Sequence, residues 1–491
     1  MKYSANQGIA VERLKELPQD DKAEIGAFHS TDEAGEPTSA GSLWREGKAN
    51  LSRPQEGNMT ETQSSVTMST SLLRLTMLGR SHPQRCFTNL NQYLTKDLLR
   101  AAFHQTRKDG ATGIDGQTAA DYGQNLEDNL ESLLERAKSG CYCAPPVKRG
   151  FVPKGKSQRP IGIPTFEDKV LQKAVVKILE KLYEPIFHPH SYGYRPRKSA
   201  HQALDVLYQQ LARSGGGQII EMDIQAFFDN LDKRQLREFL QKRIGDGVIL
   251  RLINKWLKVG VMESGRLHYP EQGTPQGGVI SPLLANVYLH YVLDEWFEQE
   301  VKPRLISSAG LVRFEDDAVL LMKNAKDAER VMNVLPKRFN RFGLELHPDK
   351  TCVTEFNPRK KSSIDFLGFT HYWGRNRRGG WSIKRKTMKS RFARSVRAIA
   401  QWCQLNRHKL LPEQHAALCR RIRGHYAYFG LRGNSVALGR FLFAVRRVWI
   451  KWLRRRSQRH ALNWISAARL LKRYPLPPAR LKTTKPVNVM S

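Results

Sequence analysis

The sequence lacks long apolar runs, paired cysteines and, in its last quarter, almost all acidic residues. No apolar run reaches the roughly 18 residues of a membrane-spanning helix, so we expect none. The first residues do not place an apolar segment after a basic one, which argues against a signal peptide. The six cysteines form no CxxC pair, which predicts a reducing cytoplasmic setting and no structural zinc.

Positive charge is abundant but unevenly distributed. The 491 residues, enough for about three domains of roughly 150 residues, contain 81 Lys plus Arg and 46 Asp plus Glu, a net charge of +35. Residues 1–80 carry a net charge of −2, whereas residues 371–491 contain 30 basic residues and one acid, Glu413. Such a chain is expected to bind a polyanion, with nucleic acid first and an anionic membrane surface second.

The patterning predicts an α+β protein in four parts. Residues 1–80 are rich in Glu, Ser, Thr, Gly and Gln, which predicts a disordered or poorly ordered leader. Residues 81–370 mix amphipathic helices with short strands, including a buried strand near 218–224 and two strands that meet at an acidic turn near 316. Residues 371–475 are expected to be helical, with three helices in 386–458, and residues 476–491 form a basic tail.

Three carboxylates stand out against apolar strand sequence. Asp223 ends a predicted buried strand, and Asp316 and Asp317 are adjacent between two further strands. A carboxylate at the end of an apolar, buried strand needs a cationic partner, because burial of an unpaired charge is costly. Neighbouring carboxylates also repel each other without such a partner. Magnesium takes oxygen ligands of this kind, and two such ions about 4 Å apart can promote nucleotidyl transfer. A bare Asp-Asp pair is otherwise typical of an exposed hairpin turn, so the surrounding motifs must decide.

Those motifs resemble the reverse transcriptases encoded by group II introns. The blocks are DIQAFFDN at 223–230, GTPQGGVISPLLAN at 273–286 and FEDD at 314–317, with shorter matches at 159–164, 191–196, 347–351 and 366–369. The resemblance extends over about residues 88–486. It implies a right-hand polymerase, with fingers and a palm that contains an antiparallel sheet in 81–370, followed by an α-helical, basic thumb or maturase domain in 371–475.

The resemblance also assigns the metal-binding and catalytic roles. Asp223, Asp316 and Asp317 would form the catalytic triad for two Mg²⁺ ions, with the Ile224 carbonyl as a further ligand. Lys350 could protonate the leaving pyrophosphate, neutralise it, or only cap the preceding loop. The acids therefore predict an RNA-directed DNA polymerase.

Nucleotide contacts are implied on the finger side and around the Pro-Gln-Gly turn. Lys154 and Arg159 would hold triphosphate oxygens, and Phe228 would exclude a ribose 2′-hydroxyl and so favour dNTPs. Gln276 would contact the incoming nucleotide, and Gly277 would let the backbone approach it closely. Without the motif, the basic residues would be ordinary surface and Phe228 an ordinary core residue.

The acidic hairpin departs from the family pattern. The family has Tyr-Ala-Asp-Asp, whereas this chain has Phe314-Glu315-Asp316-Asp317. Glu315 adds a negative charge beside the expected metals, at a cost of roughly 1–4 kcal/mol at about 4 Å. We still expect an active polymerase, because the three acids are present. The alternative is an RNA-binding splicing factor with an impaired polymerase site.

The basic C-terminal helices resemble the maturase region of the same family. An apolar stripe from Leu438 to Leu453 favours a packed core over a base-stacking platform. The expected RNA-binding residues are Arg423, Arg432, Arg446, Arg447, Lys451, Arg454 and Arg455. Because almost no acids lie nearby, phosphates would balance these charges.

The implied partners are the intron RNA, an RNA template with its DNA primer, dNTPs and target DNA, and no membrane. The protein would bind its intron RNA, assist its splicing and copy it into cDNA, in a bacterial cytoplasm or nucleoid or in an organelle. No CxxC pairs follow the expected thumb, so we do not expect a metal-dependent endonuclease domain there.

Overall fold

The computed structural model describes residues 58–154, 157–263, 265–269, 277–456 and 462–481, all within one compact unit. The predictions made for residues 1–57, for Gln276, for the side chain of Lys154 and for residues 482–491 of the basic tail lie outside the described residues. None of the described helices has the length and apolar character needed to cross a bilayer.

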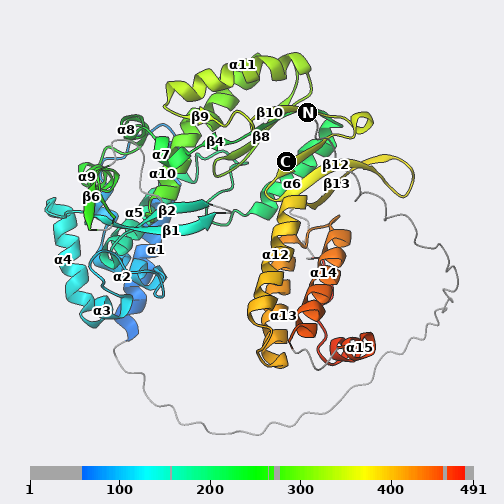
Figure 1. Ribbon diagram of the computed structural model, residues 1–491. Helices are drawn as coiled ribbons and strands as arrows, with labels where there is room; N and C mark the ends of the chain where they lie inside the picture. The colour runs from blue at the N-terminus through cyan, green and yellow to red at the C-terminus, as the bar shows by residue number, and fades with distance from the viewer. Residues whose placement is uncertain (1–57, 155–156, 264, 270–276, 457–461, 482–491) are drawn as a thin grey trace, which may run out of the picture. The chain divides into compact units, whose positions relative to one another are not determined.

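Five helices build the N-terminal part (Figure 1), namely α1 (Asn58–Ser81), α2 (Lys96–Gln105), α3 (Ala119–Gln124), α4 (Leu126–Ser139) and α5 (Phe166–Tyr183). Helix α1 differs from our expectation of a poorly ordered segment up to residue 80. It packs against α5 and α2, and its Leu75 is buried. The polar composition of residues 1–80 does not indicate this helix, because a few leucines are enough to bury one face of α1 against its neighbouring helices. Gly140 ends α4 in the left-handed conformation, with φ of 91°, which glycine adopts readily.

A sheet with the strand order β2-β1-β5-β6 lies beside these helices. Its strands are β1 (Val147–Lys154), β2 (Ser157–Ile163), β5 (Val261–Glu263) and β6 (Arg266–His268). The antiparallel β1–β2 pair forms a hairpin, and it brings Arg159 opposite Val152.

A second sheet, with the order β10-β3-β8-β7, occupies the middle of the chain. Its strands are β3 (Gly217–Met222), β7 (Ala309–Phe314), β8 (Asp317–Met322) and β10 (Cys352–Phe356). Adjacent residues enter different cores: Ile220 and Leu320 join the N-terminal core, whereas Ile219 and Val319 join the C-terminal one. This follows from the alternation of side chains along a strand, so the sheet is buried on both faces.

Helices and one short strand pair complete this region. They are α6 (Ala200–Ser214), α7 (Phe227–Asn230), α8 (Lys233–Gln241), α9 (Gly247–Leu257), α10 (Ser281–Leu289), α11 (Ala325–Arg341), β4 (Ile224–Gln225) and β9 (Glu345–Leu346). Helix α10 continues through a π-helical segment, His290–Asp294. Strand β4 leaves β3 directly and pairs with β9, so the chain turns at Asp223.

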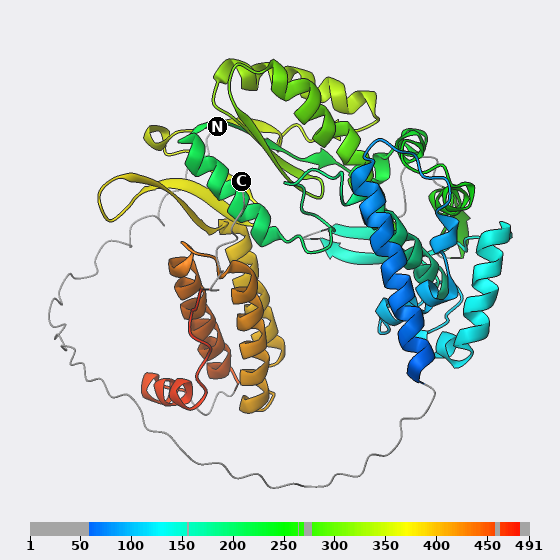
Figure 2. The same cartoon turned by 180° about the vertical axis from the view of Figure 1, so that it is seen from behind.

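The C-terminal part begins with strands. The sheet β11-β12-β13 comprises β11 (Ser363–Phe366), β12 (Phe369–Arg375) and β13 (Trp381–Thr387), and the helices are α12 (Lys389–Leu405), α13 (Leu411–Phe429), α14 (Ser435–Arg454) and α15 (Trp464–Arg473). Helices α12, α13 and α14 lie side by side in Figure 1 and in the reverse view of Figure 2.

The expected helical start at residue 371 is wrong. Residues up to Thr387 form strands, because buried positions recur every second residue at Ile383, Arg385 and Thr387. The three helices predicted within 386–458 are confirmed, and so is the apolar stripe: Leu438, Phe441, Val445 and Trp449 of α14 are all buried. The fold is therefore α+β, with several small sheets and a helical C-terminal region.

Candidate active site

The strand register brings two of the predicted acids together. Strands β3 and β8 are antiparallel with Met222 opposite Ala318, so the next position pairs Asp223 with Asp317. Their carboxyl groups share a hydrogen bond. Residues about 90 positions apart in the chain thus face each other because of one sheet pairing.

Asp316 and Glu315 form the two-residue turn between β7 and β8. Phe314 pairs with Asp317 across this turn, and Glu315 has a φ of 57°, a left-handed conformation that is unusual for a residue with a side chain. The acidic hairpin predicted from the sequence is therefore confirmed. Asp316 lines a small cavity together with Phe228, whereas Asp317 lines a different one, so adjacent acids face different spaces.

A buried ion pair holds this hairpin in place. Arg313 donates to both carboxylate oxygens of Asp294, at 2.8 and 2.6 Å, and both side chains are fully buried. The same guanidinium donates to the Glu315 carbonyl at 2.9 Å and to Asn286 Oδ1 at 3.1 Å. A buried charge pair with every bond in place fixes geometry, so this network holds the turn that carries Asp316.

Asp223 is anchored on its other side by the loop after β9. Its carbonyl accepts a hydrogen bond from the His347 amide at 2.9 Å, and Lys350 Nζ lies 2.6 Å from Asp223 Oδ2. The Lys350 side chain is 58% exposed and the Asp223 side chain 25% exposed. Lys350 therefore neutralises Asp223 from the solvent side.

The electrostatics reflect crowded negative charge. Desolvation first, and then the charges of Asp316 and Asp223, raise the pKa of Asp317 to about 7. Desolvation also raises the pKa of Glu315, while a hydrogen bond from Tyr194 and the charge of Arg159 act in the opposite direction. The cluster thus holds more negative charge than its protein partners offset.

A cavity of about 720 Å³ opens beside Asp223 and Asp317. Its wall combines strand ends of the central sheet, the β11–β12 turn around Leu367 and Gly368, and two helices that contribute Arg391 and Arg394 from α12 and Tyr428 and Phe429 from α13. Tyr428 donates to the Leu367 carbonyl at 2.8 Å, which ties α13 to that turn. The lining of this cavity therefore contains both carboxylates and guanidinium groups.

The donor set suits a divalent cation. Within the described residues, no three His, Cys, Asp or Glu side chains are placed together as a ready metal site. Asp223 and Asp317 nevertheless present oxygen donors to one space, and the raised pKa of Asp317 shows that positive charge there would be stabilising. These residues fit Mg²⁺, and the metal roles of Asp223, Asp316, Asp317 and the Ile224 carbonyl stay predictions.

The predicted nucleotide contacts gather around the same hairpin. Phe228, on α7, is half-buried and shares the small cavity with Tyr194, Glu315 and Asp316. Arg159, exposed on β2, is close enough for its charge to act on Tyr194 and Glu315. Strand β2 therefore reaches the acidic turn.

Gly277 and Ile224 have structural reasons for their identity. Gly277 has a φ of 117°, and a Cβ there would collide with the carbonyl oxygen of Gly162 on β2. Only glycine satisfies both conditions. Ile224 is buried in β4, opposite Leu346.

The predicted RNA-binding residues lie on α13, on α14 and on the connection between these helices. All but one are exposed: Arg423, Arg432, Arg446, Arg447, Lys451 and Arg455. Arg454 is half-buried instead, where it donates to the Leu462 carbonyl at 2.8 Å and covers the Trp464 ring at 4.4 Å. Its structural role is therefore visible, while the RNA contacts of the set stay predictions.

Sequence reasoning missed the supporting residues. Arg313 and Asp294 are charged residues inside apolar segments, and that pattern could have flagged a buried pair. Nothing in the sequence indicates that they meet, because the partners come from a strand and a π-helical segment. In the sequence, Tyr194 is only one residue of the motif at 191–196. Its hydrogen bond to Glu315 depends on the packing of Gly193 against the acidic turn.

Comparison with known families gives a match in this region. Residues 152–371 match the family described as "Reverse transcriptase (RNA-dependent DNA polymerase)". The matched residues include the end of β1, all of β2, the central sheet and all the acids described above.

Individual relatives agree with the family match. The chain is 38% identical over 225 residues to the group II intron-encoded protein LtrA of Lactococcus lactis, which covers 45% of this chain and 37% of LtrA. It is 32% identical over 301 residues to the protein YkfC of Escherichia coli K12, which covers 54% of this chain and 77% of YkfC. It is also 31% identical over 196 residues to the nuclear intron maturase 1, mitochondrial, of Arabidopsis thaliana, covering 36% of this chain and 27% of that protein.

Proposed function

Because this chain belongs to the reverse transcriptase family and is related to the group II intron-encoded proteins, we propose that it extends a DNA primer on an RNA template. We further propose that it binds its intron RNA, assists its splicing and copies it into cDNA, with target DNA as a further partner. In this proposal β1 and β2 belong to the fingers, the central sheet to the palm, and α12–α14 to the thumb.

One observation carries the polymerase proposal. Asp223 and Asp317 face each other and line a cavity that Arg391 and Arg394 also line. A primer backbone in this cavity would meet the arginines, and its reactive end would meet the acids. Carboxylates bind cations and guanidinium groups bind phosphates. The cavity therefore contains groups suited both to catalytic metal ions at the primer end and to the phosphates of the primer backbone.

The acids would act by holding Mg²⁺, with Asp223 and Asp317 as first ligands and Asp316 and the Ile224 carbonyl as further ones. Two bound Mg²⁺ ions would supply activation of the primer 3′-hydroxyl and charge neutralisation of the triphosphate. Lys350, now paired with Asp223, is free to turn to the leaving pyrophosphate because its side chain is largely exposed. The Arg313–Asp294 pair keeps the turn in place during the reaction.

The small cavity beside Asp316 and the strands β1 and β2 would select the nucleotide. Phe228 borders the same space as Asp316, where it would block a ribose 2′-hydroxyl. Arg159 would hold triphosphate oxygens, together with Lys154. Gly277, which follows Gln276 in the sequence, lies directly against Gly162 of β2.

Primer extension on an RNA template with Mg²⁺ and dNTPs tests the proposal. Asp223→Asn and Asp317→Asn should each lower the extension rate by about 10³-fold or more, because each removes charge stabilisation worth several kcal/mol. Their affinity for RNA should remain close to that of the unchanged protein.

The matched control is Glu329→Gln, which neutralises an exposed acid on α11. It should extend the primer normally. Absence of product from the unchanged protein, with RNA binding intact, would refute the polymerase proposal.

Glu315 favours a second candidate, an RNA-binding splicing factor with an impaired polymerase site. Its charge lies next to Asp316 and is only partly countered by Tyr194 and Arg159. If this charge limits the reaction, Glu315→Gln should raise kcat/KM for dNTPs by roughly 2- to 10-fold, the effect of one screened charge. An active Glu315→Gln variant beside an inactive unchanged protein would favour this candidate.

A further inference from the structure

The small cavity beside the acidic turn has room for one water-sized group. Its volume is about 10 Å³, and a cavity needs roughly 10–15 Å³ to hold a single water molecule. Its lining includes the rings of Phe227 and Phe228 and the polar side chains of Tyr194, Asn286, Glu315 and Asp316. A hydroxyl group therefore fits this space, whereas a whole sugar or base does not.

Among these polar side chains, Glu315 is the one best suited to accept a hydrogen bond from such a hydroxyl. The Asn286 amide is already used on both sides, because its Oδ1 accepts from Arg313 at 3.1 Å and its Nδ2 donates to the Gly193 carbonyl at 2.8 Å. Asp316 would hold Mg²⁺ in the proposed function. A carboxylate has about four lone-pair sites, so one hydrogen bond within the protein leaves Glu315 able to accept another.

Tyr194 and the packing around it hold the Glu315 side chain in place. The Tyr194 hydroxyl donates to the Glu315 carboxylate, and desolvation followed by the charge of Glu315 raises the pKa of Tyr194 to about 12, so the phenol stays a donor. Gly193 lies so close to the turn that a Cβ there would collide with the backbone and side chain of Glu315. Arg313 donates to the Glu315 carbonyl at 2.9 Å and so supports the turn. An acceptor that is already held in position loses little entropy when it binds.

The position of this acceptor indicates which group it would face. In the proposed function, Phe228 borders the sugar of the incoming nucleotide and excludes its 2′-hydroxyl. Glu315 lines the same small cavity as Phe228, so it would face that sugar as well. The sugar of a dNTP carries one hydroxyl, at its 3′ carbon, and the space admits one group of that size. The acceptor, the size of the space and the substrate therefore agree.

We propose that Glu315, positioned by Tyr194, accepts a hydrogen bond from the 3′-hydroxyl of the incoming dNTP and so selects extendable nucleotides over chain-terminating ones. The inference rests on the proposed function, because it takes the acidic turn as the place where a nucleotide is added. A nucleotide without the 3′-hydroxyl leaves the half-buried carboxylate one hydrogen bond short, and this penalty is the source of the selection. The charge that Glu315 brings beside Asp316 thereby has a use in substrate choice.

The preference of the full chain for dTTP over ddTTP tests the proposal. Incorporation of a single nucleotide on a saturating template–primer gives kcat/KM for each substrate, and their ratio cancels effects on the metal site because both carry the same triphosphate. A hydrogen bond to a charged group contributes roughly 10-fold or more, so Glu315→Ala should lower the ratio by about that factor. Glu315→Gln keeps an acceptor oxygen without the charge, and Tyr194→Phe removes the positioning hydroxyl. Each should lower the ratio by about 2- to 5-fold.

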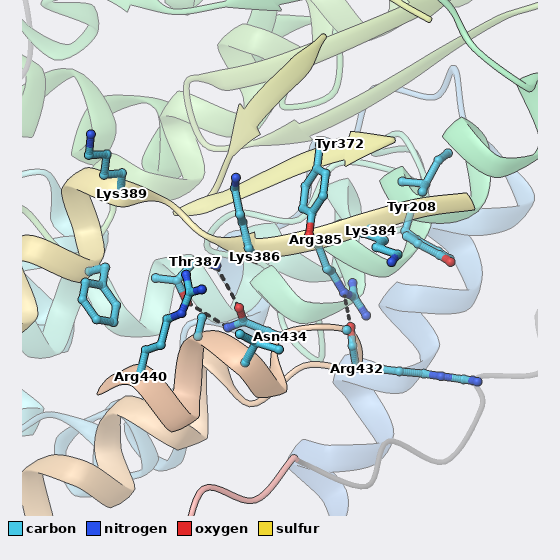
Figure 3. A pocket seen from close by; sticks show the side chains of 15 residues that line it. Tyr208, Tyr372, Lys384, Arg385, Lys386, Thr387, Lys389, Arg432, Asn434 and Arg440 are labelled. Carbon is cyan, nitrogen blue, oxygen red and sulfur yellow. Dashed lines mark hydrogen bonds between the residues drawn. The ribbon is translucent and has the colours of Figure 1, made fainter. Parts of the chain in front are cut away.

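Two variants serve as controls. Glu329→Ala removes an exposed acid on α11. Lys386→Gln alters a separate cavity of about 970 Å³, which Lys386 and Arg440 line and which shares no lining residue with the small one (Figure 3). Both variants should leave the ratio unchanged. An unchanged ratio in Glu315→Ala, or an equal fall in the controls, would overturn the proposal.

Equilibrium binding separates this proposal from the polymerase proposal. A primer that lacks its own 3′-hydroxyl cannot be extended, so calorimetry with Mg²⁺ and this primer on its template gives the Kd of dTTP and of ddTTP for the full chain. Tighter binding of dTTP by the unchanged protein but not by Glu315→Ala would support the role of Glu315 even if no primer is extended, and would then defeat only the polymerase proposal. Equal affinities, or no binding of either nucleotide, would overturn the role of Glu315.

Discussion

At the scale of single residues, Asp317 shows how neighbours determine chemistry. Its carboxyl group lies beside Asp223 and Asp316, and desolvation together with these charges raises its pKa from 3.8 to about 7. In the folded protein this group therefore binds its proton more tightly than in the unfolded chain. Its contribution to stability is present below pH 3.8 and is lost progressively as the pH rises to about 7.

This linkage predicts the behaviour of Asp317→Asn in the presence of a chelator. The variant should be more stable than the unchanged protein at about pH 8, by about 1 kcal/mol after allowance for solvent screening, and the gain should be less than half as large at about pH 5. Thermal unfolding at both pH values measures the difference. An equal gain at both pH values would mean that the charge of Asp317 is not the cause.

Gly277 carries a steric requirement that no polar contact reveals. Gly277→Ala places a methyl group against the Gly162 carbonyl in addition to its unfavourable φ of 117°. We expect a clear loss of thermal stability and about 10-fold or more lower extension, since the turn must shift away from β2. Gly379→Ala is the control, because Gly379 has a φ of 79° with open space around it and should cost only about 1 kcal/mol. Similar effects at the two glycines would show that backbone strain alone matters.

At the scale of elements, the acidic hairpin depends on a helix that the chain places behind it. Strand β7 contributes Arg313, the π-helical segment contributes Asp294, and α10 contributes Asn286, whose side-chain amide donates to the Gly193 carbonyl at 2.8 Å. The turn is thus attached to three other segments. Removal of one charge of such a buried pair leaves the other uncompensated.

Asp294→Asn should therefore destabilise the protein by about 3–5 kcal/mol. The double variant Asp294→Leu with Arg313→Met should recover part of that stability but not the activity, because the Glu315 carbonyl still loses its donor. Urea unfolding and primer extension, measured on the same samples, separate the two effects. Arg107→Met, which removes an exposed pair with Asp109, should change neither. Recovery of extension in the double variant would show that the pair only stabilises the fold.

At the scale of the whole molecule, charge and packing have different distributions. The net charge of +35 is concentrated in residues 371–491, yet the helices of this part share a hydrophobic core with Ile219, Val312 and Val319 of the central sheet. The basic region is therefore not an appendage. Its exposed arginines are held in fixed positions relative to the sheet that carries the acids.

The charge predicts a steep dependence of RNA affinity on salt. Between about 50 and 200 mM monovalent salt, the affinity should fall by roughly 10³-fold or more, because each phosphate contact releases condensed counterions. Filter binding across a salt series checks this expectation. A shallow slope would mean that stacking and hydrogen bonds, rather than phosphates, dominate the binding.

Much of the element order could be predicted from the sequence alone. The β1–β2 hairpin, strand β3, the two strands around Asp316 and the three basic helices follow from local periodicity, which depends only on near neighbours. Two predictions failed for different reasons. Helix α1 packs against α2 and against α5, which is distant in the chain, whereas β12 and β13 form a local hairpin that the basic composition of this region does not indicate.

The sequence by itself determined which residues could perform the chemistry, since the acids and the basic helices are evident from residue type and motif. Only the tertiary structure decided that Asp223 faces Asp317, that Arg313 meets Asp294, and that Lys386 and Arg440 line one cavity. The physical reason is that register and packing between segments arise from interactions far apart in the chain. An ionisable residue is the same wherever it stands in the sequence, but its pKa, its partners and its role depend on the residues that pack against it in the folded protein.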